Sequence, residues 1–191
     1  MPPITRQTFF EIMASFPSGV AIVTTVTPEG VPRGLTTTAV SSVSAHPPTV
    51  LVCVDLSSRT LDALRARRRF VVNFVGRARS QLGLLFASKA DDKFERVAWQ
   101  PTSTGLPHLH EDSLAWAECC TMHDLEVGDH VILVARVEDG GVRPELEPPL
   151  MYYRRSWGVW SPVHEATEPD PVEIEAMEVS GRDLRWQGAE F

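Results

Sequence analysis

The sequence predicts a mainly β fold, a barrel with a few short covering helices. About seven short strand-like segments bounded by turn residues run along the chain, and only a few stretches have helical spacing. Strands do not alternate with long helical segments, which argues against a parallel α/β sheet. The 191 residues suffice to bury one hydrophobic core, and there is no internal repeat.

The first expected elements are a short helix and a hairpin. Residues 6–16 have helical spacing that ends at Pro17, which predicts a helix packed against another part of the protein. Residues 20–26 are rich in β-branched side chains, and a turn at 28–30 leads into a second extended segment at 31–43. The apolar positions of the helix are Phe9, Ile12, Met13 and Phe16.

The middle of the chain predicts two strands, each followed by a short helix. Residues 49–54 form a continuous apolar run, typical of a strand buried on both faces. Ser57 or Ser58 is expected to cap a helix over 60–69. A strand at 70–74 and a helix at 81–86 follow.

The last expected elements of the domain are four strands. Residues 113–122 and 130–138 are strand-like, and apolar residues alternate from Val131 to Val137, so one face of that strand is buried. Residues 150–153 and 157–160 are expected to form the closing pair of the barrel.

Composition changes at residue 162. Residues 1–161 hold 17 acidic and 16 basic side chains, whereas 162–191 hold 8 acidic and 2 basic ones. The formal net charge of −7 therefore belongs mostly to the last segment. We expect a domain at 1–161 and an acidic C-terminal tail at 162–191 rather than a second domain.

Composition also argues against several functions. The acidic balance and the lack of a basic stripe argue against nucleic acid, and no window approaches a membrane span or an export signal, so we expect a cytoplasmic protein. The basic run from Arg65 to Arg69 is interpreted as helix-end charge. Cys53, Cys119 and Cys120 have no metal-binding spacing, which favours buried reduced thiols and no metal site.

Two hydroxyl-rich segments are the candidates for chemistry. The chain has no GxGxxG, Walker, HExxH or GxSxG motif. Residues 34–44 combine a glycine with six hydroxyl side chains, and residues 57–60 read Ser-Ser-Arg-Thr at an expected helix start. Together they suggest a planar phosphorylated ligand. A solvated sheet face and a simple helix cap remain the alternative interpretations.

These segments resemble the flavin reductase-like family, the reductase components of two-component flavin monooxygenases. The resemblance covers about residues 5–160, and its motifs occur in family order. They are Phe16-Pro17-Ser18-Gly19-Val20, Gly34-Leu35-Thr36-Thr37-Thr38-Ala39-Val40, Ser57-Ser58-Arg59-Thr60, Arg69-Phe70-Val71-Val72-Asn73-Phe74, Asp92-Lys93-Phe94, Gly128-Asp129-His130 and Tyr152-Tyr153-Arg154.

The resemblance implies a homodimeric split β-barrel that binds FMN or FAD and takes hydride from NADH or NADPH. Reduced flavin would then pass to a partner monooxygenase. The residues carried over to the flavin ring and ribityl chain are Thr36, Thr37, Thr38, Ala39, Val40, Ser42 and Val43. Those carried over to the phosphate are Ser57, Ser58, Arg59 and Thr60, and Lys93 and Phe94 would close over the flavin edge.

The resemblance also implies a nicotinamide site. His130, Tyr153 and Arg154 match positions near the nicotinamide, where His130 would orient the ligand rather than abstract a proton. A purely structural histidine is the alternative for His130, and Arg154 with Arg155 suits either a pyrophosphate or a dimer interface. Trp157 stands where the family more often has Tyr, which leaves fine substrate selection open.

The sequence therefore predicts an NAD(P)H:flavin oxidoreductase. One alternative is a split-barrel sensor or carrier that holds flavin or haem without turnover. Another is a pyridoxine phosphate oxidase type of enzyme, for which the expected basic phosphate ligands are missing. Four points stay open: FMN against FAD, NADH against NADPH, the partner monooxygenase, and the order and contacts of the tail.

Overall fold

The computed structural model describes residues 3–144 and 147–159. Within these ranges, no helix is long and apolar enough to cross a membrane. The elements run in this order: α1 (Arg6–Ala14), β1 (Ser18–Gly19), β2 (Ala21–Val26), β3 (Pro32–Thr37), β4 (Val40–Ala45), β5 (Pro48–Asp55), α2 (Leu61–Arg67), β6 (Arg69–Val75), η1 (Arg77–Arg79), α3 (Ser80–Ala87), η2 (Lys93–Glu95), β7 (Gln100–Pro101), β8 (Pro107–His108), β9 (Ser113–Val127), β10 (His130–Val142), β11 (Leu150–Tyr153) and β12 (Ser156–Val159).

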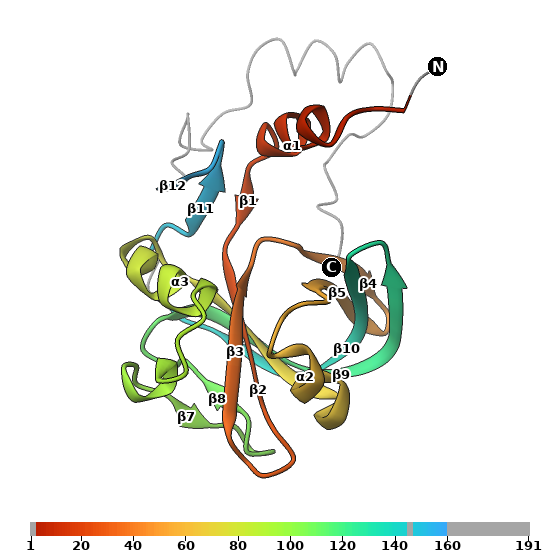
Figure 1. Cartoon of the computed structure of the whole chain (residues 1–191). Coiled ribbons are helices and arrows are strands. Elements are labelled where there is room, and N and C mark those ends of the chain that lie inside the picture. Colours follow the sequence, from red (N-terminus) through yellow and green to blue (C-terminus); the bar gives the residue numbers. More distant parts are fainter. Residues whose placement is uncertain (1–2, 145–146, 160–191) are drawn as a thin grey trace, which may run out of the picture. The chain divides into compact units, whose positions relative to one another are not determined.

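A seven-stranded antiparallel sheet forms the barrel, in the order β3-β2-β6-β9-β10-β5-β4. Its two edge strands, β3 and β4, are consecutive in the sequence. The backbone N–H of Cys53 on β5 donates to the carbonyl of Ala39, between these strands, at 2.9 Å. Only residues 38 and 39 link these two edge strands, so the sheet curls back on itself at this junction, which confirms the mainly β, split-barrel prediction. Figure 1 shows the β2–β3 hairpin in front, with α2 and α3 on opposite sides of it.

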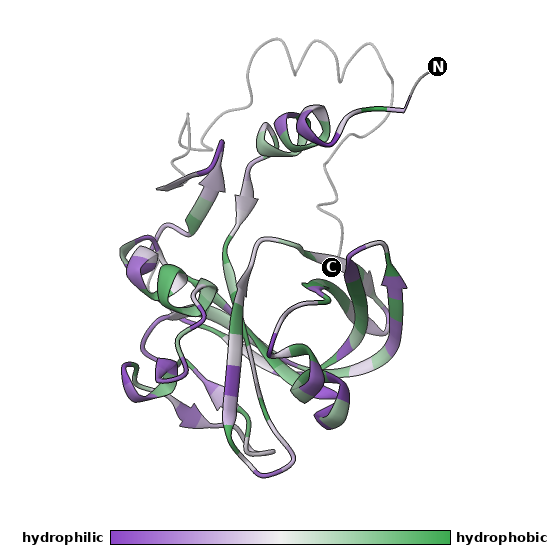
Figure 2. Ribbon diagram, in the orientation of Figure 1, coloured by the Kyte–Doolittle hydropathy of each residue, from purple (hydrophilic) through white to green (hydrophobic). Residues whose placement is uncertain are grey.

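Two apolar clusters hold the domain together. The first lies inside the barrel and includes Val52, Phe70 and Leu133, with Leu64 of α2 packed against it. The second includes Ile22 and Phe86 and joins α3 to the barrel. The buried residues of β10 are Val131, Leu133 and Ala135, so its predicted alternation is confirmed. In Figure 2 β5 is largely green, whereas β3 and α1 carry both hydrophobic and hydrophilic residues.

Several sequence expectations needed correction. The extended segment 31–43 is not one strand, because residues 38 and 39 leave the sheet and the chain passes from one edge to the other. The pair β11 and β12 forms as expected, but it makes a separate sheet with β1 instead of closing the barrel. The strands β9 and β10 extend to Val127 and Val142, beyond their predicted ends. Trp160 lies outside the described residues.

The helix α1 forms where it was predicted but is not packed as expected, since none of its residues is buried. Phe9 and Ile12 are 50% and 55% exposed, and Phe16 just after the helix is 65% exposed. The three cysteines are free, and burial raises the pKa of Cys119 to about 12. The proposed tail at 162–191 lies outside the described residues.

Candidate functional site

Two cavities lie along the junction between β3 and β4. The polar cavity has a volume of about 320 Å³, and the apolar cavity has about 640 Å³. Thr36 and Thr37 line the first, whereas Thr38, Ala39 and Val40 line the second. Neighbouring residues of β5 divide in the same way, with Cys53 in the polar cavity and Leu51 in the apolar one. The strand at 49–54 was expected to be buried on both faces, but it is buried on only one, and residues of its other face line the cavities.

The turn after β5 brings its hydroxyl groups into the polar cavity. Ser57, Ser58 and Thr60 all line it. The Ser57 hydroxyl donates to Asp55 Oδ1 at 2.6 Å, and these contacts with Ser57 hold the pKa of Asp55 below its usual value. Ser58 Oγ accepts from the backbone N–H of Thr60 at 3.3 Å, so its own proton remains available for an anion.

The expected helix cap at this turn is wrong. The residue that caps α2 is Thr60, whose own side chain makes no capping hydrogen bond. The helix is shorter than predicted, because Arg68 adopts the left-handed conformation, with φ 54°, and ends it. Ser57 and Ser58 are therefore loop residues whose hydroxyls face a cavity, which favours the ligand interpretation of this motif over the cap.

Three cations, Arg59, Lys89 and Lys93, line the polar cavity, and Asp91 pairs with only the first of them. Arg59 Nη1 pairs with Asp91 Oδ1 at 2.8 Å, an exposed contact that solvent screens. Lys93 Nζ donates to the carbonyl oxygens of Phe86 at 2.8 Å and Gly34 at 3.3 Å. Desolvation, followed by the charge of Arg59, lowers the pKa of Lys93. This end of the cavity is suited to an anion.

Close packing fixes the wall of the polar cavity. A side chain at Gly34 would meet the Phe86 ring at 2.7 Å, so only glycine lets β3 approach α3 this closely. Thr36 Oγ1 donates to the carbonyl of Gly83 at 2.6 Å, which also ties β3 to α3. Phe94 stacks edge-on against Phe86, with ring centroids 5.2 Å apart. The helix α3 therefore positions β3, Lys93 and Phe94 as one unit.

His130 also lines the polar cavity. It begins β10 and pairs with Asp55 across the sheet. Its Nδ1 lies 2.7 Å from Asp129 Oδ1, which leaves Nε2 as the ring nitrogen available to a ligand. His130 therefore stands beside the hydroxyl groups predicted for the phosphate.

Tyr153 and Arg154 line the apolar cavity, not the polar one. Arg154 and Arg155 form the β11–β12 turn with φ values of 47° and 63°, a conformation that costs free energy in residues other than glycine. The Arg154 guanidinium lies 5.4 Å from the centre of the Tyr153 ring. Within one chain, the residues predicted for the nicotinamide thus divide between the two cavities.

The remaining predicted residues lie at the margins. Ser42 and Val43 are on the edge strand β4 and line neither cavity, and Val43 is 53% exposed. Phe94 borders a smaller neighbouring cavity. Trp157 packs against Gly83 in the second apolar cluster, so it belongs to the core. Within the described ranges, no cluster of three His, Cys, Asp or Glu residues could hold a metal ion.

Sequence reasoning missed several residues of the site, among them Lys89, Asp55, Arg33 and Asp91. Asp55 was detectable, because an aspartate two residues before a serine is typical of a side-chain-stabilised turn. Arg33 and Asp91 carried no local signal, since only the folded chain brings β3 beside the loop after α3. The donor set fits a phosphorylated ligand with a flat apolar ring: hydroxyls and cations line one cavity, and the next residues of segment 36–40 line a larger apolar cavity.

Comparisons with known proteins identify the family. The profile described as "Flavin reductase like domain" matches residues 13–161. A flavin reductase (NADH) from Kitasatospora aureofaciens is 45% identical over 163 residues, 85% of each chain. A flavin reductase (NADPH) from Lentzea aerocolonigenes is 38% identical over 160 residues, 83% of this chain and 92% of that protein.

A solved structure supports the same assignment. The NADH:FAD oxidoreductase of Streptomyces globisporus, in complex with NAD and FAD fragments, is 26% identical with a TM-score of 0.78, over 86% of this chain and 100% of that one. Fold, cavities and relatives together define a flavin-dependent oxidoreductase. The chain belongs to the flavin reductase-like family, and it is an NAD(P)H:flavin oxidoreductase.

Proposed function

We propose that the polar and apolar cavities together bind one flavin, with the phosphate among residues 57–60 and the ring toward the apolar cavity. The adjacency of the two cavities carries this proposal, because segment 36–40 lines both of them. A ligand with a phosphate at one end and a planar apolar ring at the other matches this order of polar and apolar walls.

The residues of the polar cavity bind and orient the ligand. Arg59 and the Ser58 hydroxyl hold the phosphate, and Lys93 keeps α3 and β3 together while adding positive charge. In this reaction the nicotinamide supplies a hydride, which the flavin accepts. The protein contributes by aligning the two ligands and needs no nucleophile of its own.

We also propose roles for the nicotinamide residues. Asp129 fixes the ring of His130, and Nε2 of His130 then positions the nucleotide at the mouth of the polar cavity. Tyr153 and Arg154 contact the nucleotide from the apolar cavity. A nucleotide in contact with all three residues spans both cavities along the β3–β4 junction.

The partners of the chain follow from its relatives. The reductase component of a 4-nitrophenol monooxygenase from Rhodococcus opacus is 37% identical over 87% of both chains. We propose that this chain likewise supplies reduced flavin to a monooxygenase in the cytoplasm. The exposed apolar residues of α1 support a homodimer, since such residues on a helix favour burial by a second copy. A monomer in sedimentation equilibrium would overturn the homodimer.

Steady-state oxidation of NADH and NADPH with FMN, FAD or riboflavin tests the activity. We expect turnover that depends on added flavin, because the flavin is an exchangeable substrate. The alternative is a sensor or carrier that retains flavin or haem. A tightly retained ligand and no nucleotide oxidation with any flavin would favour that alternative and refute the reductase.

A further inference from the structure

A third cavity, the arginine cavity, adjoins the polar one. It has a volume of about 140 Å³ and lies between β3, the turn before α2 and the loop after α3. Gly34, Arg59, Thr60 and Lys93 line both cavities, so the two share these walls. Arg33 lines only the arginine cavity.

The charge in the arginine cavity is unbalanced. Its charged lining residues are three cations, Arg33, Arg59 and Lys93, and one carboxylate, Asp91. Asp91 pairs with Arg59. Among the described residues, the hydrogen bond of the Arg33 guanidinium is a long one, 3.4 Å to the carbonyl of Pro32, and no carboxylate pairs with it. A positive charge without a carboxylate partner therefore borders this cavity.

Arg33 and Lys93 also act on each other. Among the causes that lower the pKa of Lys93, after desolvation and Arg59, is the charge of Arg33. Like charges held together in this way are unfavourable until an anion lies between them. The cavity adjoins the proposed flavin phosphate site, so the anion that fits it is a second phosphate beside the first.

We propose that the arginine cavity receives the second phosphate of FAD and that Arg33 is a specificity residue that favours FAD over FMN. This inference rests on the proposed flavin phosphate site at residues 57–60. The two phosphates of FAD share one oxygen, which matches two cavities with shared walls. At about 140 Å³, well below the roughly 300 Å³ of a small ligand pocket, the cavity suits a phosphate, and the adenosine would extend beyond it.

The test compares Arg33→Gln and Arg33→Lys with the wild-type chain. KM values for FMN and FAD are measured at saturating NADH, and calorimetry gives both dissociation constants without turnover. We expect Arg33→Gln to raise the KM and Kd for FAD about tenfold and to change those for FMN less than twofold. Arg33→Lys should restore part of the loss, because it keeps the charge but not the fork of donors.

Arg77→Gln is the matched control. It removes the same charge from an exposed position on η1 that lines none of these cavities, and it should leave the ratio of FAD to FMN affinity unchanged. Thermal unfolding of all variants checks that each is folded. Arg33 is partly exposed and makes one weak hydrogen bond, so we expect both Arg33 variants to keep the Tm of the wild-type chain.

Three results would overturn the inference. If Arg33→Gln raised KM and Kd equally for FMN and FAD, Arg33 would belong to the phosphate site that both flavins share. If KM and Kd did not change for either flavin, Arg33 would have no role in ligand binding. A KM that rises for NADPH but not for NADH would assign the cavity to the phosphate of the nicotinamide nucleotide. These results differ from a failure of the proposed function, because in that case the wild-type chain would bind neither FMN nor FAD.

Discussion

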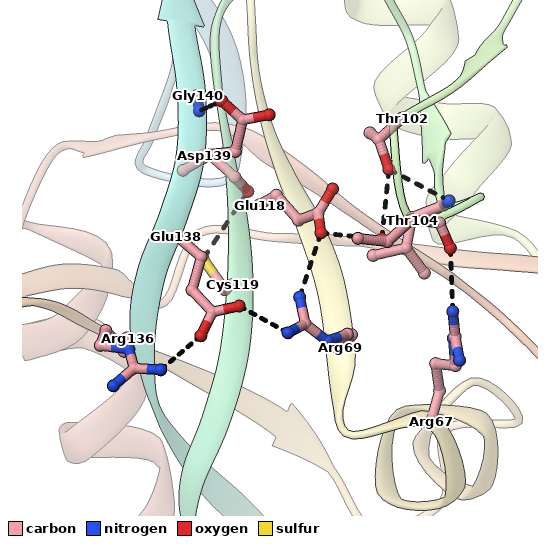
Figure 3. Close-up of polar contacts among 12 residues, drawn as sticks. Arg67, Arg69, Thr102, Thr104, Glu118, Cys119, Arg136, Glu138, Asp139 and Gly140 are labelled. Carbon is pink, nitrogen blue, oxygen red and sulfur yellow. Dashed lines mark hydrogen bonds and ion pairs between the residues drawn. The ribbon is translucent and has the colours of Figure 1, made fainter.

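Two clusters of charged side chains in this protein differ in how their charges are balanced. On β6, β9 and β10, Arg69 pairs with Glu118 at 3.2 Å and with Glu138 at 2.6 Å, and Arg136 pairs with Glu138 at 2.5 Å. Figure 3 shows Arg69 between the two carboxylates, with Thr104 donating to Glu118. In the arginine cavity, by contrast, three cations face one carboxylate.

The difference separates a structural cluster from a binding cluster. In the first cluster two arginines and two carboxylates balance in charge and tie adjacent strands together, and only Glu118 Oε2 is buried without a hydrogen-bond partner. Around the arginine cavity the cations outnumber the carboxylates, so the excess positive charge is balanced only when an anion binds. The first cluster should therefore govern the stability of the fold, and the second the affinity for flavin.

The largest expected effect is the loss of a buried carboxylate. Glu118→Ala should lower the free energy of unfolding by about 3 kcal/mol, because Arg69 and Thr104 lose a buried partner. The KM for flavin should not change, since Glu118 lines none of the three cavities. Urea denaturation and steady-state kinetics on the same samples measure both quantities.

Glu126→Ala is the control for this variant. Its side chain is 60% exposed in a pair with Arg65, so its removal should cost less than about 1 kcal/mol. If the two variants were equally stable, or if Glu118→Ala raised the KM for flavin, the division between structural and binding clusters would be wrong.

The loss of the Glu138 carboxylate should have a smaller effect, on the pH dependence of the free energy of unfolding. Hydrogen bonds from Arg136, then from Arg69, hold the pKa of Glu138 below its usual 4.5. A lowered folded-state pKa adds stability above the unfolded value, and this stability is lost as the pH falls through the folded value. Glu138→Gln should therefore flatten the fall in unfolding free energy below pH 4.5, as measured by denaturant titrations. An identical slope in both proteins would show that the pairing contributes nothing.

Local patterns in the sequence predicted most elements of the fold. Alternation at Val131, Leu133 and Ala135 located β10, and β-branched residues located β2. The break at residues 38 and 39 was not predictable, because the segment 31–43 is continuously strand-like and only the curvature of the barrel divides it. The exposure of Phe9 and Phe16 was hidden for a similar reason, since periodicity shows an apolar face but not what covers it.

The candidate site was predictable only in part. The hydroxyl-rich motifs pointed to residues 36–40 and 57–60; residues 57–60 line the polar cavity, and segment 36–40 lines both cavities. The separation of His130 from Tyr153 had no signal in the sequence, because it depends on β11 joining β1 instead of the barrel. Nothing in the sequence indicated a role for Arg33 either, because only the fold places its charge beside Lys93 and Arg59.

The central claim is that the flavin phosphate lies among residues 57–60, and riboflavin, which lacks the phosphate, tests it most directly. The KM values for FMN and riboflavin are compared in wild-type chain and in the double variant Ser58→Ala with Arg59→Ala. We predict that the KM of the wild-type chain is at least about tenfold lower for FMN than for riboflavin. In the double variant the KM for FMN should rise to that for riboflavin, whose own KM should not change. An unchanged preference for FMN in the double variant would contradict the account.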